Sequence, residues 1–330
     1  MSRHPTIRDV AEQAGVSIAT VSRVLNDRAD VSIETRERVR EVARSVGYSA
    51  DPAARGLATQ KTQLIAVVVG DNAGHRDLSL LFFGKVMAAI SRRLAPADYD
   101  SLLLQPLELG THHRYDAAIL IGIDGSDSLI KDLYARSTPY VGVDVRVSGP
   151  GSAFVGSDHA AGVRLALGHL HELGHRRIGH VAGARNTVAG ADRIAAFQRE
   201  AGLLGLEVPD EYVREADFSS AAGYEATAAL LALPDRPTAL VAASDLMALA
   251  ALQAIRDAGL QPGHDVAVIG FDDLEAAALA HPPLTTIRQD REKLGVIAAE
   301  RAIELAEHPD VRPVDTILPV ELVVRASTQP

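Results

Sequence analysis

The sequence predicts a small all-helical N-terminal domain followed by an α/β body of two doubly wound parallel-sheet subdomains. Three observations support this prediction. The first 50 residues contain three amphipathic helical stretches, short apolar runs alternate with helical stretches from Leu64 onward, and 330 residues exceed what one hydrophobic core usually supports. A content of 47% hydrophobic and 23% charged residues is typical of a globular chain and excludes disorder for most of it.

Cysteine is absent, which excludes a disulfide framework, a zinc ribbon and a thiol nucleophile, and fits a reducing compartment. The longest apolar runs, such as 64–69 and 117–123, fall far short of the roughly 20 residues that a membrane span needs. The N-terminus shows no apolar signal-peptide core. We therefore expect a cytoplasmic protein with no membrane partner.

The formal net charge of −10 is unevenly distributed along the chain. Residues 1–62 carry 10 Lys and Arg against 8 Asp and Glu, a net charge of +2, so the remainder carries −12. A total of −10 argues at first against a polyanionic partner. The division instead assigns the acidity to the body and leaves a weakly basic N-terminal segment.

The N-terminal domain is predicted to contain three helices. Thr6 is the N-cap of a helix that ends at Gly15, and Ser17 caps a second short helix after a turn of three residues. Ser32 caps a third helix, 33–46. We expect its inner face to consist of Ile33, Val39, Val42, Ala43 and Val46.

Two short helices joined by a tight turn with glycine form a helix-turn-helix, whose second helix contacts base edges in the major groove. Its hydroxyl groups suit phosphate contacts, and Arg23 is the one side chain able to donate two hydrogen bonds to guanine. Ile18 and Ala19 offer apolar contact only. The hydroxyls belong to Ser17, Thr20 and Ser22. A generic three-helix bundle fits the same spacing, and the stripe Arg36, Arg40 and Arg44 suits either phosphates or solvent.

The stretches IRDVAEQAGVSIATVSRVLN and VSIETRERVREVARSVGYSADPAARGLA resemble the N-terminus of the LacI/GalR family of bacterial transcription repressors. The resemblance implies a helix-turn-helix DNA-binding domain at 1–49 and a hinge helix with linker at 50–62. The DNA contacts that it implies are Thr6, Ser17, Ile18, Ala19, Thr20, Ser22, Arg23, Asn26, Ser32, Thr35, Tyr48, Ala54 and Leu57.

In that family the hinge folds on operator DNA and inserts a leucine into the minor groove, which makes Leu57 the wedge by resemblance. An apolar wedge unstacks a base step and bends the duplex. Gly56 weakens an isolated helix by about 1 kcal/mol relative to alanine, which is consistent with folding on DNA only. The alternative is an ordinary core leucine, although the following Thr59-Gln60-Lys61-Thr62 has the composition of a polar linker.

The body alternates continuously apolar strands with helices, which is typical of parallel sheets covered on both faces. Ligands of such sheets bind beyond the carboxyl ends of the strands. Polar residues follow several apolar runs there, namely Asp144, Ser244, Asp245, Asp272 and Asp273, and Arg193 opens a helix at another such edge. Converging carboxylates and an arginine suit a polyhydroxylated ligand. Each aspartate also suits a helix cap, and we assign Asp245 and Asp273 that role.

The resemblance continues through the body, which is similar to periplasmic sugar-binding proteins. It implies an effector-binding and dimerisation domain at 63–330, with an N-subdomain at about 63–156 plus 288–318 and a C-subdomain at about 157–287 plus 319–330. The implied effector contacts are Phe82, Phe83, Asp144, Arg193, Phe218, Ser244, Asp272 and Gln289. Phe218 would stack on a sugar face, and core packing is its alternative role.

Two features depart from the family pattern. Ser244 stands where several sugar-binding relatives have an amide, which removes a bidentate contact. The segment 105–115 is about 20 residues shorter than the family norm, so a helix expected before the apolar run at 117 is missing or vestigial. This shortening affects the surface of the N-subdomain and part of its usual dimer contact.

The string His171-Glu172-Leu173-Gly174-His175 fits the zinc-protease pattern, which needs both histidines on one unbroken helix. Gly174 is placed like the glycine that ends a helix at 159–173, so we expect His175 to leave the helix face. We therefore predict no metal site, no cofactor and no enzymatic activity. Glycine-rich phosphate loops and nucleophile-elbow motifs are also missing from the sequence.

The first hypothesis is a homodimeric DNA-binding transcriptional regulator, a repressor, that binds palindromic operator DNA under the control of a small-molecule effector, a sugar or related metabolite. A plain sugar-binding protein is the second hypothesis and a metal-dependent hydrolase the third. Residues 1–57 distinguish the first from the second, and Gly174 distinguishes it from the third. No apolar heptad tail follows the last predicted strand, so we expect no tetramer through such a tail.

Overall fold

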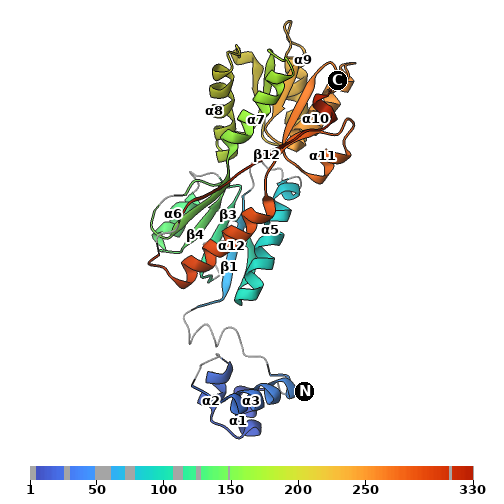
Figure 1. The fold of residues 1–330 in the computed structure, drawn as a ribbon. Helices are drawn as coiled ribbons and strands as arrows, with labels where there is room; N and C mark the ends of the chain where they lie inside the picture. Colours follow the sequence, from blue (N-terminus) through green and yellow to red (C-terminus); the bar gives the residue numbers. More distant parts are fainter. Residues whose placement is uncertain are drawn as a thin grey trace. The chain divides into compact units, whose positions relative to one another are not determined.

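The computed structural model describes residues 5–25, 30–48, 61–70, 79–106, 114–123, 128–147, 149–311 and 314–329. The predicted DNA contacts Asn26, Ala54 and Leu57, most of the hinge and most of the shortened segment 105–115 lie outside the described residues. The chain forms two compact units, the head (Met1–Gln63) and the body (Leu64–Pro330) (Figure 1).

The head contains the three predicted helices, α1 (Ile7–Ala14), α2 (Ile18–Leu25) and α3 (Ile33–Ser45). The predicted caps are confirmed. Thr6 and Asp9 form a capping box, Gly15 ends α1 at φ 65°, and Ser17 Oγ accepts the Thr20 N–H at 3.1 Å. Ser32 Oγ accepts the Thr35 N–H at 3.3 Å. These caps satisfy backbone donors that a helix start leaves unpaired.

The head core is formed by small apolar residues from all three helices, including Val10, Val21 and Val39, which are fully buried. Ile33 was predicted to belong to this core, and that prediction is wrong because its side chain is 76% exposed. Ile33 precedes Val39 by six residues, and at 3.6 residues per turn this places its side chain about 120° around the helix from the buried face.

The body contains two six-stranded sheets, each with its own helices, as the sequence predicted. We call them lobe 1 and lobe 2. The order in lobe 1 is β11 (Thr316–Leu318), β5 (Ser152–Ser157), β4 (Tyr140–Val143), β3 (Ala117–Ile121), β1 (Leu64–Val69) and β2 (Asp100–Leu104). The order in lobe 2 is β12 (Glu321–Val323), β10 (Thr285–Arg288), β9 (Ala267–Asp272), β8 (Ala239–Ala242), β6 (Ile178–Ala182) and β7 (Val213–Glu215).

All neighbouring strands are parallel except β10 and β12, which are antiparallel. Fully buried strands such as β3 and β4 are apolar throughout because helices cover both faces of each sheet.

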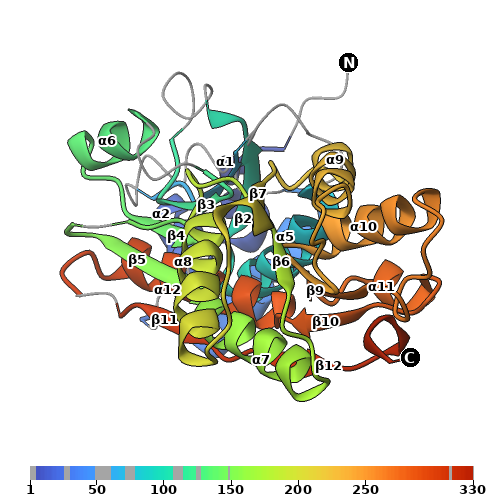
Figure 2. The ribbon, with the colours of Figure 1, turned by 90° about the horizontal axis from the view of Figure 1, so that it is seen from above.

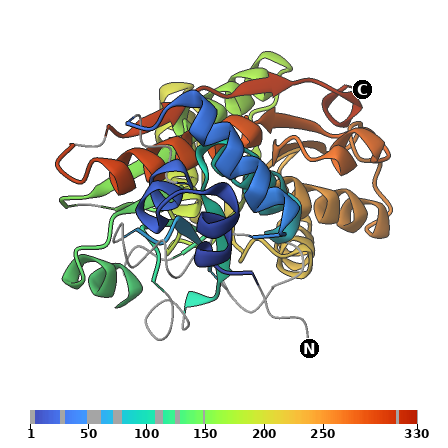
Figure 3. The same ribbon diagram turned by 90° about the horizontal axis from the view of Figure 1, so that it is seen from below.

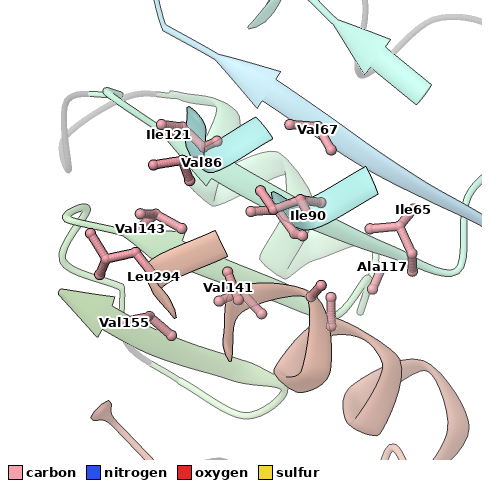
Figure 4. Close-up of a cluster of buried hydrophobic side chains, with 14 of the residues drawn as sticks. Ile65, Val67, Val86, Ile90, Ala117, Ile121, Val141, Val143, Val155 and Leu294 are labelled. Atoms are coloured by element: carbon pink, nitrogen blue, oxygen red, sulfur yellow. The ribbon is translucent and has the colours of Figure 1, made fainter. Parts of the chain in front are cut away.

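In lobe 1, α5 (Ser79–Leu94) and α12 (Arg291–Glu307) pack on one face, and α6 (Ser128–Ala135) packs on the other. Figure 4 shows Val86 and Ile90 of α5 and Leu294 of α12 directed at the strands. Gly295 permits the close contact of these two helices, because a Cβ there would lie 2.4 Å from the Val86 carbonyl oxygen.

In lobe 2, α7 (His159–Glu172) and α8 (Val188–Leu203) cover one face. The other face is covered by α9 (Ser220–Leu231), α10 (Asp245–Asp257) and α11 (Glu275–Leu279). Figure 2 shows α7 and α8 on the opposite side of the sheet from α9 and α10. No helix in the described part of the chain is both long and apolar enough to span a bilayer.

The chain passes between the lobes three times within the described residues. It leaves lobe 1 between β5 and α7, returns between β10 and α12, and leaves again between β11 and β12 (Figure 3, red). Residues at these crossovers therefore connect the two sheets, and any change in lobe geometry must be accommodated there.

Candidate functional site

The N-terminal turn of α2 presents the predicted DNA contacts at the surface of the head. Ser17, Ile18 and Ala19 are exposed, and Thr20 and Ser22 are half-buried. The hydroxyl oxygens of Ser17 and Thr20 lie 2.9 Å apart. This turn therefore combines hydroxyl groups that suit phosphate with short apolar side chains that fit close to a groove.

Arg23, on the last turn of α2, is the predicted base-reading side chain. Its Nη1 lies 3.6 Å from the Asp30 carboxylate, and both side chains are 58% exposed. Because exposed ion pairs contribute at most about 1 kcal/mol, this pair does not prevent Arg23 from turning to a guanine.

The other described DNA-contact candidates lie near helix starts or at the end of α3. Thr6 belongs to the capping box of α1, and the hydroxyls of Ser32 and Thr35 are 2.9 Å apart at the start of α3. Tyr48 is half-buried and packs against the head core. Helix starts favour anions, so Thr6 and Ser32 are placed where a phosphate would be stabilised.

All eight residues predicted to contact the effector line one cavity between lobe 1 and lobe 2. Lobe 1 contributes Phe82, Phe83 and Asp144, lobe 2 contributes Arg193, Phe218, Ser244 and Asp272, and the second crossover contributes Gln289. The remaining lining residues are Gly122, Ile123, Val143, Thr187, Ala189, Asp217, Ser219, Leu246 and Leu274.

The carboxyl ends of parallel strands place the polar members of this set. Asp144 follows β4, Ser244 follows β8, Asp272 ends β9 and Gln289 follows β10. The backbone turns sharply at three lining positions, with φ values of 50° at Asp144, 68° at Phe218 and 130° at Asp272. Side chains other than glycine rarely adopt such values, and strain of this kind clusters at functional sites.

The guanidinium of Arg193 is buried and has several fixed contacts. Nη1 donates to the carbonyl oxygen of Ala243, Nη2 lies 3.3 Å from His159 Nδ1, and Cζ lies 3.7 Å from the centre of the Phe271 ring. Nε has no hydrogen-bond partner among the described residues. Arg193 is thus held rigidly and retains one buried donor without an acceptor.

Asp272 and Gln289 form the second fixed pair of the cavity. Gln289 Nε2 donates to Asp272 Oδ1 at 2.7 Å, while Gln289 Oε1 has no partner among the described residues. Burial raises the pKa of Asp272 well above its usual value, although Arg193 and the Gln289 hydrogen bond oppose the shift. Asp272 therefore holds a proton more readily than an ordinary carboxyl, and Gln289 fixes its orientation.

Asp144 is the carboxylate of lobe 1. Its burial would raise its pKa, but His159, Arg193 and the Ser157 N–H together lower the pKa below the usual value. Asp144 is therefore an anion at neutral pH. Among the lining residues, the guanidinium of Arg193 is thus matched by the carboxylate of Asp144, and Asp217 and Asp272 add no positive charge, so the cavity offers no excess cation to an anionic ligand.

Aromatic rings form the apolar part of the cavity. Phe82 and Phe83 are in edge-to-face contact with ring centres 5.3 Å apart. The Phe218 ring lies against Gly183, where a Cβ would be 2.1 Å from Phe218 Cζ. The absence of a side chain at Gly183 therefore leaves room for this ring, which packs partly against the core of lobe 2 as well.

Two aspartates were assigned wrongly from the sequence. Asp245 is not the cap of α10, because Ser244 accepts the Met247 N–H; Asp245 instead accepts the Leu274 N–H and the Thr286 hydroxyl. Asp273 does not cap α11 either. Its carboxylate forms ion pairs with Arg288 and Arg325. Each aspartate therefore connects the segment that follows one strand of lobe 2 with residues of neighbouring strands.

Sequence reasoning missed Thr187, Asp217, Ser219 and His159. Thr187 and Ser219 cap α8 and α9. Because each lies in the segment that follows a strand, the rule for carboxyl ends would have found them. His159 follows β5, whose sequence Ser-Ala-Phe-Val-Gly-Ser is too polar to be recognised as a buried strand.

The prediction that the helix ends before His175 is confirmed. Helix α7 ends at Glu172, Gly174 has φ 90°, and His175 Nδ1 pairs with the Thr238 hydroxyl at 2.9 Å. Among the described residues, no group of three or more His, Asp or Glu side chains is arranged to hold a metal ion.

Head and body match different family models. Residues 6–51 match the model of bacterial regulatory proteins of the lacI family, and residues 167–328 match the periplasmic binding protein-like domain. The transcriptional regulator CelR of Thermobifida fusca is 33% identical over 336 residues, covering 98% of each chain.

Two solved structures resemble the whole chain. The complex of CelR with cellobiose has a TM-score of 0.75 and 31% identity, covering 98% of this chain and 99% of that one. The lac repressor dimer bound to operator and the anti-inducer ONPF has a TM-score of 0.83 and 31% identity, covering 99% and 100%.

Proposed function

Because the chain belongs to the lacI family of bacterial regulatory proteins, we propose that its cavity binds a neutral, polyhydroxylated effector that controls the affinity of the head for operator DNA. The protein is a DNA-binding transcriptional regulator. The observation that carries the proposal is the convergence of all eight predicted effector residues on one cavity.

The chemistry of the cavity supports a ligand with several hydroxyl groups. Arg193 Nε is a donor without an acceptor and Gln289 Oε1 an acceptor without a donor, within the part of the chain that the structure describes. Both atoms are buried below the cavity surface, so the ligand contacts fall to the other polar atoms of the lining residues. A hydroxyl group both donates and accepts, which suits the mixture of guanidinium, carboxylate and amide groups there. Phe218 supplies an aromatic surface for a sugar ring. The one guanidinium of the lining is matched by Asp144, so no cation is left to hold the phosphate of a phosphorylated sugar.

For the head, we propose that α2 lies in the major groove. Arg23 reads a base, Ser17, Thr20 and Ser22 contact phosphates, and Ile18 and Ala19 contact base edges. Leu57 and Ala54 then enter the minor groove through the hinge. The likeness to a lac repressor dimer bound to operator supports a homodimer on a palindromic site.

We also propose that the protein acts as a cytoplasmic repressor without catalytic activity of its own. The match to transcriptional regulators along 98% of the chain supports this role. In the described part of the chain, the histidines of the protease-like string separate at the end of α7.

A thermal-shift screen of the full-length protein tests the ligand class. The probes are cellobiose, lactose and glucose, with glucose 6-phosphate as the anionic counterpart of glucose. We expect at least one neutral sugar to raise Tm, and Asp272→Asn to abolish that rise, because ligand binding to the folded state stabilises it. Asp132→Asn, at an exposed position on α6, is the control and keeps the rise. A response to glucose 6-phosphate alone contradicts the proposal.

A further inference from the structure

Several buried polar atoms without a partner lie at the crossovers between the lobes. Among the described residues, eight buried side-chain atoms make no hydrogen bond. Three of them, Ser157 Oγ, His159 Nε2 and Gln289 Oε1, belong to residues at the first and second crossovers. Such atoms are rare in folded proteins because each one loses its hydrogen bonds to water. The lobe junction therefore retains hydrogen-bonding groups that a change in lobe geometry can pair.

His159 connects the two lobes directly. It is the first residue of α7 in lobe 2, and its side chain is 2% exposed. Its Nδ1 lies 3.3 Å from Arg193 Nη2. Because arginine only donates, Nδ1 accepts from Arg193, which leaves Nε2 to face Asp144 as the donor of the ring. Nε2 lies 3.3 Å from Asp144 Oδ1 of lobe 1, close enough for attraction but without the geometry of a full hydrogen bond.

A second link joins the same two segments at the surface. Arg146 Nη2 donates to both carboxylate oxygens of Asp192, at 2.8 and 2.7 Å. Arg146 lies two residues after Asp144, and Asp192 immediately precedes Arg193. The loop after β4 in lobe 1 is therefore attached to α7 and α8 of lobe 2 by one buried and one exposed contact.

We propose that His159 is a positioning residue that holds the two lobes in one arrangement across the cavity, with the Arg146–Asp192 pair as an outer ion pair. This inference rests on the proposed function in one respect, which is that the cavity is the effector site. Asp144 and Arg193 line the cavity from different lobes, so the contacts of His159 with both set the separation of the two charges. A small closure of the lobes completes the bond from Nε2 to Asp144.

The absence of cysteine allows a direct measurement of the lobe arrangement. Lys131→Cys on α6 and Gln198→Cys on α8 place the only two thiols on exposed helix positions of lobe 1 and lobe 2. Figure 1 shows α6 and α8 on the same side of the body. Spin labels on this pair report the distance between the lobes by pulsed electron resonance, in the full-length protein without any sugar.

We expect one narrow distance distribution in the parent protein. His159→Leu and His159→Ala are expected to add a second, longer distance, with up to about a fivefold rise in its population, because the attraction between the ring and Asp144 is lost together with the contact to Arg193. Both variants lose the polar contacts of His159, but leucine fills the space of the ring and alanine does not. The same result in both therefore shows that the polar contacts matter and not the packing. His169→Leu is the matched control and keeps the narrow distribution, because His169 bonds Thr328 within lobe 2.

A folded His159→Leu or His159→Ala protein with the parent distribution overturns the proposal. A distribution that broadens equally in His169→Leu also overturns it, because the effect then arises from a general loosening of α7. Neither outcome depends on sugar binding, so failure of this inference is distinguishable from failure of the proposed function.

Discussion

Gln289 donates its side-chain N–H to Asp272 over 2.7 Å, which links the second crossover to the end of β9. The bond orients a carboxylate and an amide toward the same cavity and leaves Gln289 Oε1 without a partner in the described structure. A ligand that contacts these two side chains thereby touches both the second crossover and the end of β9 in lobe 2. Ligand contact with this pair therefore acts directly on the second crossover.

Arg23→Ala is expected to weaken specific operator binding by about 5- to 150-fold, which corresponds to the ~1–3 kcal/mol of a good base contact. Non-specific binding should weaken much less, because other basic residues still contact phosphates. Fluorescence anisotropy on an operator selected from random duplexes, and on a scrambled duplex, measures both affinities. Equal losses on the two duplexes would show that Arg23 contacts phosphate and does not read a base.

Gly183→Ala is expected to lower sugar affinity by about tenfold or more, because the new methyl group displaces the Phe218 ring. Calorimetric titration with the sugar identified by thermal shift measures the loss. Gly202→Ala on α8 is the matched control, since no atom lies within 4 Å of its added Cβ. It should bind sugar normally and gain up to about 1 kcal/mol in stability from helix propensity. Normal binding by Gly183→Ala would leave Phe218 with a packing role only.

Asp245→Ala is expected to destabilise the body by about 2–4 kcal/mol, because it leaves the Leu274 N–H and the Thr286 hydroxyl without their acceptors in a buried site. Urea denaturation measures the change. Asp257→Ala, an exposed position on the same helix, should cost less than about 1 kcal/mol. Similar losses for the two variants would be incompatible with the structural role assigned to Asp245.

His180 gives the body a specific acid sensitivity. It is fully buried against Phe197, and burial lowers its pKa from 6.5 to about 4 although its Nδ1 bonds the Val241 carbonyl oxygen. Between pH 6.5 and 4, His180 is therefore protonated in the unfolded chain but not in the folded chain. The stability contribution is present above pH 6.5 and is lost as the pH falls to 4, by about 3 kcal/mol at most.

His180→Leu should remove this part of the pH dependence of the unfolding free energy, measured by urea denaturation between pH 7 and 4. His308→Gln, at an exposed position, should retain it. An unchanged slope in His180→Leu would show that the acid sensitivity arises elsewhere.

The fold was predictable because apolar runs with helical stretches between them specify parallel sheets covered on both faces. The cavity was predictable because residues after such runs converge, and the family resemblance selected which of them, such as Asp144 and Gln289, to expect there. Three errors have physical causes. Ile33 is apolar but lies about 120° around α3 from Val39, so its residue type does not predict its exposure. Asp245 and Asp273 stand where helix caps are expected, and a sequence does not show which distant neighbours their carboxylates accept from.

His159 could not be identified in advance for a different reason. Its importance comes from contacts with Asp144 and Arg193, which are 15 and 34 positions away in the chain. Arg193 meets it through the packing of α8 beside α7 within lobe 2, and Asp144 meets it only because lobe 1 faces lobe 2. The ion pair of Arg146 with Asp192 is equally non-local. Contacts between lobes depend on the relative placement of two sheets, which local pattern and propensity do not specify.

The central claim is that one ligand in the cavity controls DNA binding by the head. Its most direct test is the operator affinity of the full-length protein, measured with and without the sugar at a concentration that saturates the parent protein. We expect the sugar to change the parent Kd by about fivefold or more, and to leave the Kd of Asp272→Asn unchanged while that variant still binds operator. A response of Asp272→Asn equal to that of the parent protein would contradict the account.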